Sequence, residues 1–566
     1  MRFVKRLVLI LVLCAVGVAL FRGTEPVEVE PGSVLLVELG GAYVEGPEPP
    51  MVMRLLGRVD KPLASVLGDL AKAERDNRID VVVIRIRELQ IGWAKVQELR
   101  DAILRLNRAG RETVAFLETE TFGSNQEFYL ATAAGEVVLS PGTRAPLVGL
   151  AAEFFFLGGA WEKLGIELEV ERIGKYKSAA ESISGKSMSE PSREMANAML
   201  DSINRSFITG MAQGRELSNE WVKAAVDEAP VQTARLKELG MIDEILFFDQ
   251  LLERYEDKPT IKAEVYAGVE PADVGFEPVA QFAVVYGSGG VTRQPRSSAR
   301  SGPVLNAQVV SETLDAVAND PEIDAILFRV DSPGGSPLAS DIVWRAVERA
   351  RLKKPVVASL SDVAASGGYY VICGADRIVA EPATLTGSIG VFAIRPVLSG
   401  LLTNLGIGTD SIVKAKHAGV LLSSKGLTEE GRERFRADIR ATYNQFIGRV
   451  AQGRNMSLEA VNDVGQGRVW TGEQALEVGL VDALGGLREA ALQGKELLGL
   501  EPDDDVALLP YPQPKPLAEQ LGEVLGGSQL GAQIWMPSSL RKLESILSLV
   551  PEGAPVALLP YWVEIH

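Results

Sequence analysis

An internal repeat constrains this chain more than any other feature of its sequence. Five segments of the first half recur in the same order in the second half, at spacings of 244, 241, 239, 239 and 239 residues. Examples are RIDVVVIRI (78–86) with EIDAILFRV (322–330), and AQGRELS (212–218) with AQGRNMS (451–457). The segments keep their order, and the spacing between the copies changes by only a few residues. The sequence therefore predicts two tandem domains of one type, at about residues 34–255 and 280–500. We call them the first and second repeat.

Each repeat alternates strand and helix patterns. In the second repeat, the β-rich run AILFRV (325–330) precedes the helical segment SDIVWRAVERARLKK (340–354) and the next buried strand, PVVASL (355–360). The helical segment places its apolar residues on one face, namely Ile342, Val343, Ala346, Val347 and Ala350. Strands separated by helices predict an α/β fold with parallel sheets and right-handed crossover helices.

The two ends of the chain differ from the repeats. Three basic residues precede an uncharged run of 15 residues, 7–21, which is typical of a secretory signal, and no A-x-A site follows. We expect an uncleaved signal anchor within residues 1–33, with its basic end in the cytoplasm and the remainder exported. The tail, 501–566, contains PYPQPKP (510–516) and then a predicted helix to about residue 550. The motif VALLPY occurs twice, at 506–511 and 556–561.

Composition excludes several classes of function. The net charge is −17, and no basic stripe offsets it, which argues against nucleic acid as a partner. Cys14 and Cys373 are the two cysteines, so neither a disulfide framework nor a thiolate metal site is expected. The two histidines are His417 and the terminal His566, and nothing near His417 resembles an orienting carboxylate.

The two repeats differ where chemistry is expected. The second repeat has DSPGGS (331–336) after its first matched strand, where the first repeat has RELQIG (87–92). It also has Ser366 between small residues, where the first repeat has Asn125 with Ser124 beside it. A Gly-Gly turn leaves backbone N–H groups uncovered, and such groups stabilise an oxyanion. The pattern therefore predicts an acyl-transfer site with Ser366 as the nucleophile and backbone donors from Gly334 or Gly335 and from Gly367.

A serine nucleophile needs a base, and lysine can serve when burial or nearby positive charge keeps its amine neutral. Two lysines occupy equivalent positions in the repeats, Lys177 in RIGKYKSAAE and Lys416 in IVKAKHAG. The residues alone leave both candidates open.

Three stretches together carry a family resemblance: RVDSPGGSPLAS (329–340), ASGGYYVICGADRIVAEPATLTGSIGVF (365–392) and GKYKSAAE (174–181). They resemble the bacterial signal peptide peptidases of the serine–lysine type, in the long, duplicated form known as protease IV. The likeness extends from about residue 34 to 500. It implies two ClpP/crotonase-like domains behind an N-terminal membrane anchor.

The resemblance also implies roles for residues. The lysine of Y-K-S-A is the base and comes from the first repeat, and the serine of T-G-S-I-G orients its amine. Shorter relatives take their lysine from the position of Lys416, which therefore stays as the alternative base. The implied site needs no metal or cofactor and consists of Ser366 (nucleophile), Lys177 (base), Ser388 (orienting) and Gly334, Gly335 and Gly367 (oxyanion hole).

The implied activity is a membrane-anchored serine endopeptidase. Its expected substrates are extended, apolar peptides, above all the remnants of cleaved signal peptides. The resemblance implies a protein of the inner membrane that crosses it once, with a cytoplasmic N-terminus and a periplasmic body. It also implies assembly into a homotetramer. Two alternatives remain from the sequence: a crotonase-like acyl-CoA hydratase or lyase, and a catalytically inactive membrane scaffold.

Overall fold

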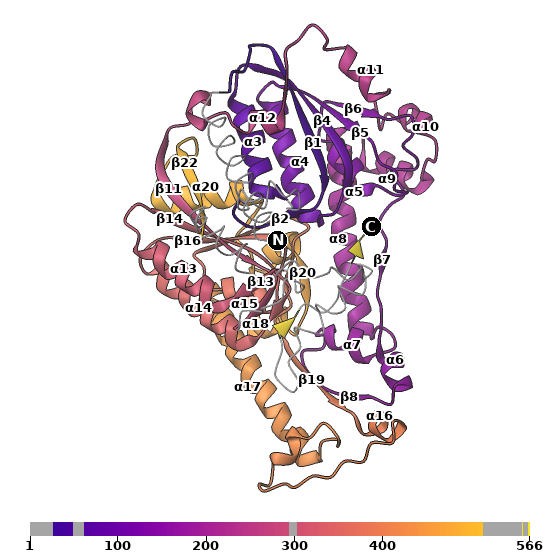
Figure 1. Cartoon of the computed structure of the whole chain (residues 1–566), viewed down its shortest axis with the longest axis vertical. Coiled ribbons are helices and arrows are strands. Elements are labelled where there is room, and N and C mark those ends of the chain that lie inside the picture. The colour runs from indigo at the N-terminus through magenta and orange to yellow at the C-terminus, as the bar shows by residue number, and fades with distance from the viewer. Residues whose placement is uncertain (1–26, 49–60, 294–302, 513–556, 559–563, 566) are drawn as a thin grey trace, which may run out of the picture.

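Two sheets built on one plan organise the chain (Figure 1). The computed structural model describes residues 27–48, 61–293 and 303–512, together with 557–558 and 564–565. The first sheet contains, in spatial order, β10 (Thr260–Lys262), β1 (Ser33–Gly41), β4 (Ile79–Leu89), β5 (Glu112–Leu117), β6 (Glu136–Leu139) and β9 (Glu244–Ile245). The second repeats this order with β22 (Asp505–Tyr511), β11 (Pro278–Ser288), β14 (Ala325–Ser332), β16 (Val356–Ala365), β17 (Arg377–Ala380) and β21 (Ala483–Leu484).

All of these neighbouring strands run parallel. The predicted duplicated α/β fold with parallel sheets is therefore confirmed. Each sheet has an edge strand just beyond the repeat limits taken from the sequence, 260–262 in the first and 505–511 in the second. The second sheet also branches at β16 to β18 (Leu385–Gly387), which pairs antiparallel with β20 (Val469–Thr471).

Helices cover the sheets, and their sequence signals are visible in the structure. The first repeat has α3 (Leu63–Arg75), α4 (Trp93–Arg108), α5 (Asn125–Ala131) and α8 (Glu190–Gly214), and the second has α13 (Ala307–Asn319), α14 (Pro337–Arg351), α15 (Gly367–Ile372) and α17 (Glu429–Arg454). Proline opens α14, and the Ser336 side chain caps it by accepting the Ala339 N–H. The apolar face predicted for this helix is buried, apart from the half-buried Ile342.

The two repeats also join away from their sheets. Strand β8 (Glu167–Ile173) of the first repeat pairs antiparallel with β19 (Val391–Val397) of the second, in the lower part of Figure 1. The register places Ile173 opposite Val391 and Glu167 opposite Val397. This pairing ties a first-repeat segment to the residues that follow β18.

The chain ends are described in part. The expected anchor at 7–21 and the expected tail helix lie outside the described residues. Within the part of the chain that the structure describes, no helix has both the length and the apolar character needed to cross a membrane. Both VALLPY motifs contribute to strands, the first as part of β22 and the second as β23 (Ala557–Leu558). Strand β23 pairs with β15 (Gly334–Gly335), and β24 (Glu564–Ile565) pairs with β7 (Ala152–Glu153).

Candidate active site

Ser366 lies at the junction of β16 and α15, and its side chain is buried. Its backbone has φ 56° and ψ −114°, a conformation that L residues rarely adopt and that is frequent in functional turns. Neighbouring strands hold this conformation, because the Ser366 N–H donates to the Gly387 carbonyl at 2.8 Å. The Tyr370 N–H donates in turn to the Ser366 carbonyl at 2.9 Å. The hydroxyl is therefore carried on a fixed turn.

The two glycines after Ser366 permit close packing on the Gly-Gly turn. A Cβ atom on Gly368 would lie 2.4 Å from the Ser332 carbonyl oxygen, and one on Gly367 would lie 2.9 Å from the Gly335 nitrogen. No larger side chain fits at either position without a shift of the backbone. The small residues around Ser366 thus bring the start of α15 against the turn that the sequence predicted to carry backbone donors.

Lys177 of the first repeat contacts Ser366 of the second. Its Nζ lies 2.7 Å from Ser366 Oγ, 2.9 Å from Ser388 Oγ and 3.0 Å from the Ser388 carbonyl oxygen. The three side chains are fully buried. Three residues that the sequence analysis selected, from two repeats, thus meet at one point.

Burial disfavours the charged form of this amine. The pKa of Lys177 is lowered well below its usual value because the charged form loses its hydration inside the protein. The Ser388 carbonyl oxygen can only accept, so at least one N–H of Lys177 points to it. A neutral amine held in this way keeps a lone pair available for a hydroxyl proton, which is what a general base requires.

The β8–β19 pairing explains how a first-repeat lysine reaches this place. Strand β8 ends at Ile173, opposite Val391, which lies three residues after Ser388. The chain then turns, and the Tyr176 N–H donates to the Gln466 carbonyl of the second repeat at 2.9 Å. A Cβ atom on Gly467 would lie 2.6 Å from the Lys177 Cα, so this loop packs directly on the lysine backbone.

The Gly-Gly turn has backbone conformations that favour glycine. Gly334 has φ 102° and Gly335 has φ 157°. The Gly334 N–H donates to Ser332 Oγ at 3.2 Å, so an incoming oxyanion would have to displace this contact to use that donor. Leu558 and Ala557 lie opposite Gly334 and Gly335 in an antiparallel ladder. The turn therefore already carries an extended segment of chain.

The other sequence candidates lie elsewhere. The Lys416 side chain is 71% exposed, and its Nζ lies 2.6 Å from Glu430 Oε1. His417 is half-buried, with Nε2 3.9 Å from the same oxygen. In the first repeat, the Asn125 side chain accepts the N–H groups of Val148 and Gly149 at 3.1 Å each. At the position of the serine, the first repeat thus has an amide that holds a loop.

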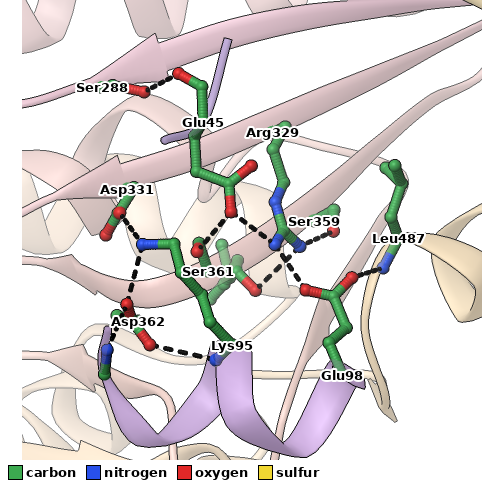
Figure 2. Close-up of polar contacts among 12 residues, drawn as sticks. Glu45, Lys95, Glu98, Ser288, Arg329, Asp331, Ser359, Ser361, Asp362 and Leu487 are labelled. Atoms are coloured by element: carbon green, nitrogen blue, oxygen red, sulfur yellow. Dashed lines mark hydrogen bonds and ion pairs between the residues drawn. The ribbon is translucent and has the colours of Figure 1, made fainter. Parts of the chain in front are cut away.

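Sequence analysis did not single out a largely buried cluster of ion pairs near the carboxyl ends of β14 and β16 (Figure 2). The cluster joins residues of both repeats: Lys95 with Asp331 and Asp362, and Arg329 with Glu45 and Glu98. A comparison of the repeats could have pointed to its two aspartates, because the first repeat has no carboxylate at either aligned position.

The chain is similar to known peptidases. The model of Peptidase family S49 matches residues 117–262 and 348–501. The chain is 33% identical over 528 residues to Serine protease SPPA, chloroplastic, of Arabidopsis thaliana, covering 91% of this chain and 76% of that protein. It is 27% identical to Protease 4 of Salmonella typhi, covering 88% and 85%. It is 37% identical to the Putative signal peptide peptidase SppA of Enterococcus faecium, covering 32% and 53%.

Proposed function

Because this chain belongs to peptidase family S49 and is a serine peptidase, we propose that Ser366 is its nucleophile and Lys177 its general base. The observation that supports this most directly is the 2.7 Å contact between Lys177 Nζ and Ser366 Oγ. The alternative base, Lys416, is exposed and paired with Glu430. The family assignment also removes the acyl-CoA hydratase or lyase alternative.

Acylation would begin with the neutral amine of Lys177. As Ser366 Oγ forms a bond to the carbonyl carbon of a peptide, its proton passes to Lys177 Nζ. The resulting ammonium has three N–H bonds, and the three contacts of Nζ, two of them to Ser388, match them in number. The ammonium then gives a proton to the leaving amine as the C–N bond breaks, which leaves an acyl-enzyme.

Deacylation would use the same groups in the reverse order. A water molecule attacks the ester carbon while Lys177 takes its proton, and Ser366 leaves with that proton as the acid is released. In both steps the negative oxygen needs backbone donors. We assign these to Gly335 and Gly367, which lie against each other, with Gly334 joining when its contact to Ser332 opens.

The substrate we propose is an extended, apolar peptide such as a signal-peptide remnant. The pairing of Ala557–Leu558 with Gly334–Gly335 supports an extended backbone at this turn. The name of the Enterococcus faecium relative, which includes signal peptide peptidase, supports signal peptides as the substrate. We further propose that residues 7–21, which lie outside the described residues, anchor the chain in the inner membrane with its body in the periplasm.

We also propose self-assembly, expected to be tetrameric from the family resemblance, and the repeat suggests how it occurs. By the repeat spacing, β8 corresponds to residues 406–412 and β19 to residues 150–156. In the described structure these two segments do not pair with each other, and β7 within 150–156 is paired with β24. They expose apolar side chains, including Phe155 at 70% and Ile412 at 84%.

Residues 406–412 form no strand in the described structure, and β7 pairs along one edge, with β24. An exposed strand edge is a template to which another chain can add a strand. We infer that residues 406–412 of one chain pair with residues 150–156 of the next, as β8 pairs with β19 inside the chain. Such a contact is heterologous, and it closes into a ring when the rotation between chains permits.

Labelling of Ser366 tests the proposed activity. The full-length protein is treated with a fluorophosphonate, and the modified residue is identified by mass spectrometry in parallel with hydrolysis of an apolar peptide. We expect an adduct on Ser366, and loss of both label and hydrolysis in Ser366→Ala. Hydrolysis that persists in Ser366→Ala would contradict the assignment and favour another nucleophile; absence of hydrolysis in the wild type would favour the inactive scaffold.

A further inference from the structure

A second buried lysine of the first repeat, Lys95, contacts two carboxylates of the second repeat. Figure 2 shows Lys95 rising from α4 between Asp331 and Asp362. Its Nζ lies 2.6 Å from Asp331 Oδ2 and 2.7 Å from Asp362 Oδ2, and its side chain is 7% exposed. Asp362 also accepts the backbone N–H groups of Gly92 and Lys95, at 3.0 and 3.1 Å. One helix terminus thus holds both carboxylates.

These two aspartates lie near the carboxyl ends of the strands that lead into the candidate active site, Asp331 in β14 and Asp362 in β16. Asp331 precedes Gly334 by three residues, and Asp362 precedes Ser366 by four. The ends of these two strands are also joined directly, because Asp331 Oδ1 accepts the Val363 N–H at 3.2 Å. A movement of either carboxylate would therefore shift the Gly334–Gly335 turn relative to Ser366.

We propose that Lys95 is a positioning residue, which sets the distance between the Gly334–Gly335 turn and Ser366 by bridging Asp331 and Asp362. This inference rests on the proposed function, since it assumes that both loops take part in peptide cleavage. It gives the first repeat a second contribution to the site of the second repeat, besides the lysine base.

The repeats themselves support a role tied to the active site. At the position of Asp331 the first repeat has Arg87, and at the position of Asp362 it has Thr121. The paired carboxylates thus occur in the repeat that carries Ser366, and the repeat with Asn125 lacks both. If the bridge served only to pack one sheet against helices, no such difference between the repeats would be required.

Charge makes the bridge depend on Lys95. Two carboxylates that share one buried site repel each other, and removal of the ammonium leaves that repulsion uncompensated. The loops can relieve it by moving apart. A substitution far from the reacting groups can lower the reaction rate by about 10²-fold when it displaces those groups by about 1 Å.

The experiment compares the acylation rate of Ser366 by a fluorophosphonate, and kcat and KM for peptide hydrolysis, across four full-length proteins. These are the wild type, Lys95→Met, Lys95→Arg, and Lys95→Met combined with Asp331→Asn and Asp362→Asn. The control is Arg215→Met, which breaks a partly buried ion pair with Asp243 inside the first repeat. Thermal unfolding is recorded for each protein.

We expect Lys95→Met to lower the acylation rate and kcat by about tenfold or more with little change in KM, and Lys95→Arg to retain most activity. In the triple variant the thermal stability should recover because the repulsion is gone. The acylation rate should stay below that of the wild type, because no ion-pair bridge then fixes the distance between the Gly334–Gly335 turn and Ser366. Arg215→Met should lose stability but acylate at the wild-type rate.

Wild-type acylation in Lys95→Met, or full recovery of the rate in the triple variant, would overturn the positioning role. Equal losses of rate in Arg215→Met would do the same, because they would show that stability alone governs the rate. Failure of the wild type itself to be labelled at Ser366 would instead refute the proposed function.

Discussion

Lys177 Nζ lies 2.7 Å from Ser366 Oγ, although 189 residues separate them and they belong to different repeats. Lys95, also buried and also from the first repeat, has the opposite electrostatic environment. Burial lowers the pKa of Lys177, whereas at Lys95 the same desolvation is outweighed by Asp331 and Asp362, which raise its pKa. The first repeat thus supplies one buried amine whose charged form is disfavoured and one whose charged form is favoured.

The buried amine of Lys177 should cost stability, and Lys177→Met should recover it. Burial disfavours the charged amine in the folded state, while the unfolded chain protonates it below its usual pKa near 10.5. The unfolded state therefore binds the extra proton, and the penalty on folding grows as the pH falls below that value. We expect Lys177→Met to have the higher free energy of unfolding at pH 7, with the difference shrinking at pH 9. Denaturant titration at both pH values measures it, and a difference that grows with pH would be contrary to this account.

The same depressed pKa predicts the pH dependence of catalysis. Because the amine must be neutral to accept the serine proton, kcat/KM should rise with pH through one ionisation well below the usual lysine value, and then level off. Lys177→Arg should be inactive at every pH, since a guanidinium stays charged. Peptide hydrolysis across the pH range measures this profile. An inflection at the ordinary lysine pKa would show that the amine is not desolvated during catalysis.

Gly367→Ala should impair the chemical step. The new Cβ would lie 2.9 Å from the Gly335 nitrogen and 2.8 Å from Ser340 Oγ, so the turn and the start of α15 would move apart. We expect kcat to fall by about 10²–10³-fold, the usual effect of losing an oxyanion donor. Gly419→Ala is the matched control, because a Cβ there meets no atom within 4 Å. Steady-state kinetics of both variants test the prediction, and equal activity would remove Gly367 from the proposed oxyanion hole.

Assembly should depend on the two exposed segments that mirror β8 and β19. We expect Phe155→Asp and Ile407→Asp each to lower the molar mass measured by light scattering, because a charge in a paired apolar edge is unfavourable. Leu352→Asp provides the control, since Leu352 is 81% exposed and lies in neither segment. If all three variants keep the wild-type mass, the assembly uses another surface or does not form.

Much of the fold could be predicted because the pattern of strands and helices occurs twice in the sequence. The alternation around AILFRV and PVVASL indicated parallel strands, and β14 and β16 pair in parallel. The edge strands β10 and β22 were missed, since each is set by pairing with a distant strand rather than by its own pattern. The β8–β19 pairing was missed for the same reason, as it joins residues more than 200 positions apart.

The site could be predicted where chemistry demands unusual residues. Ser366 and the Gly-Gly turn stood out because the first repeat lacks them. Lys177 was one of two lysines at equivalent positions in the repeats, and Ser388 entered through the family resemblance. The residues alone could not separate Lys177 from Lys416, because burial and not local sequence distinguishes the two. Lys95 gave no signal of its own, since its partners come from distant segments of the other repeat. The catalytic roles of all these residues stay predictions.

The central claim, that Lys177 activates Ser366, is tested most directly by the rate at which a fluorophosphonate acylates Ser366 in Lys177→Met and Lys416→Met. We predict that Lys177→Met reacts at least about 10²-fold more slowly than the wild type, while Lys416→Met reacts at the wild-type rate. A normal rate in Lys177→Met with a slow rate in Lys416→Met would contradict the account.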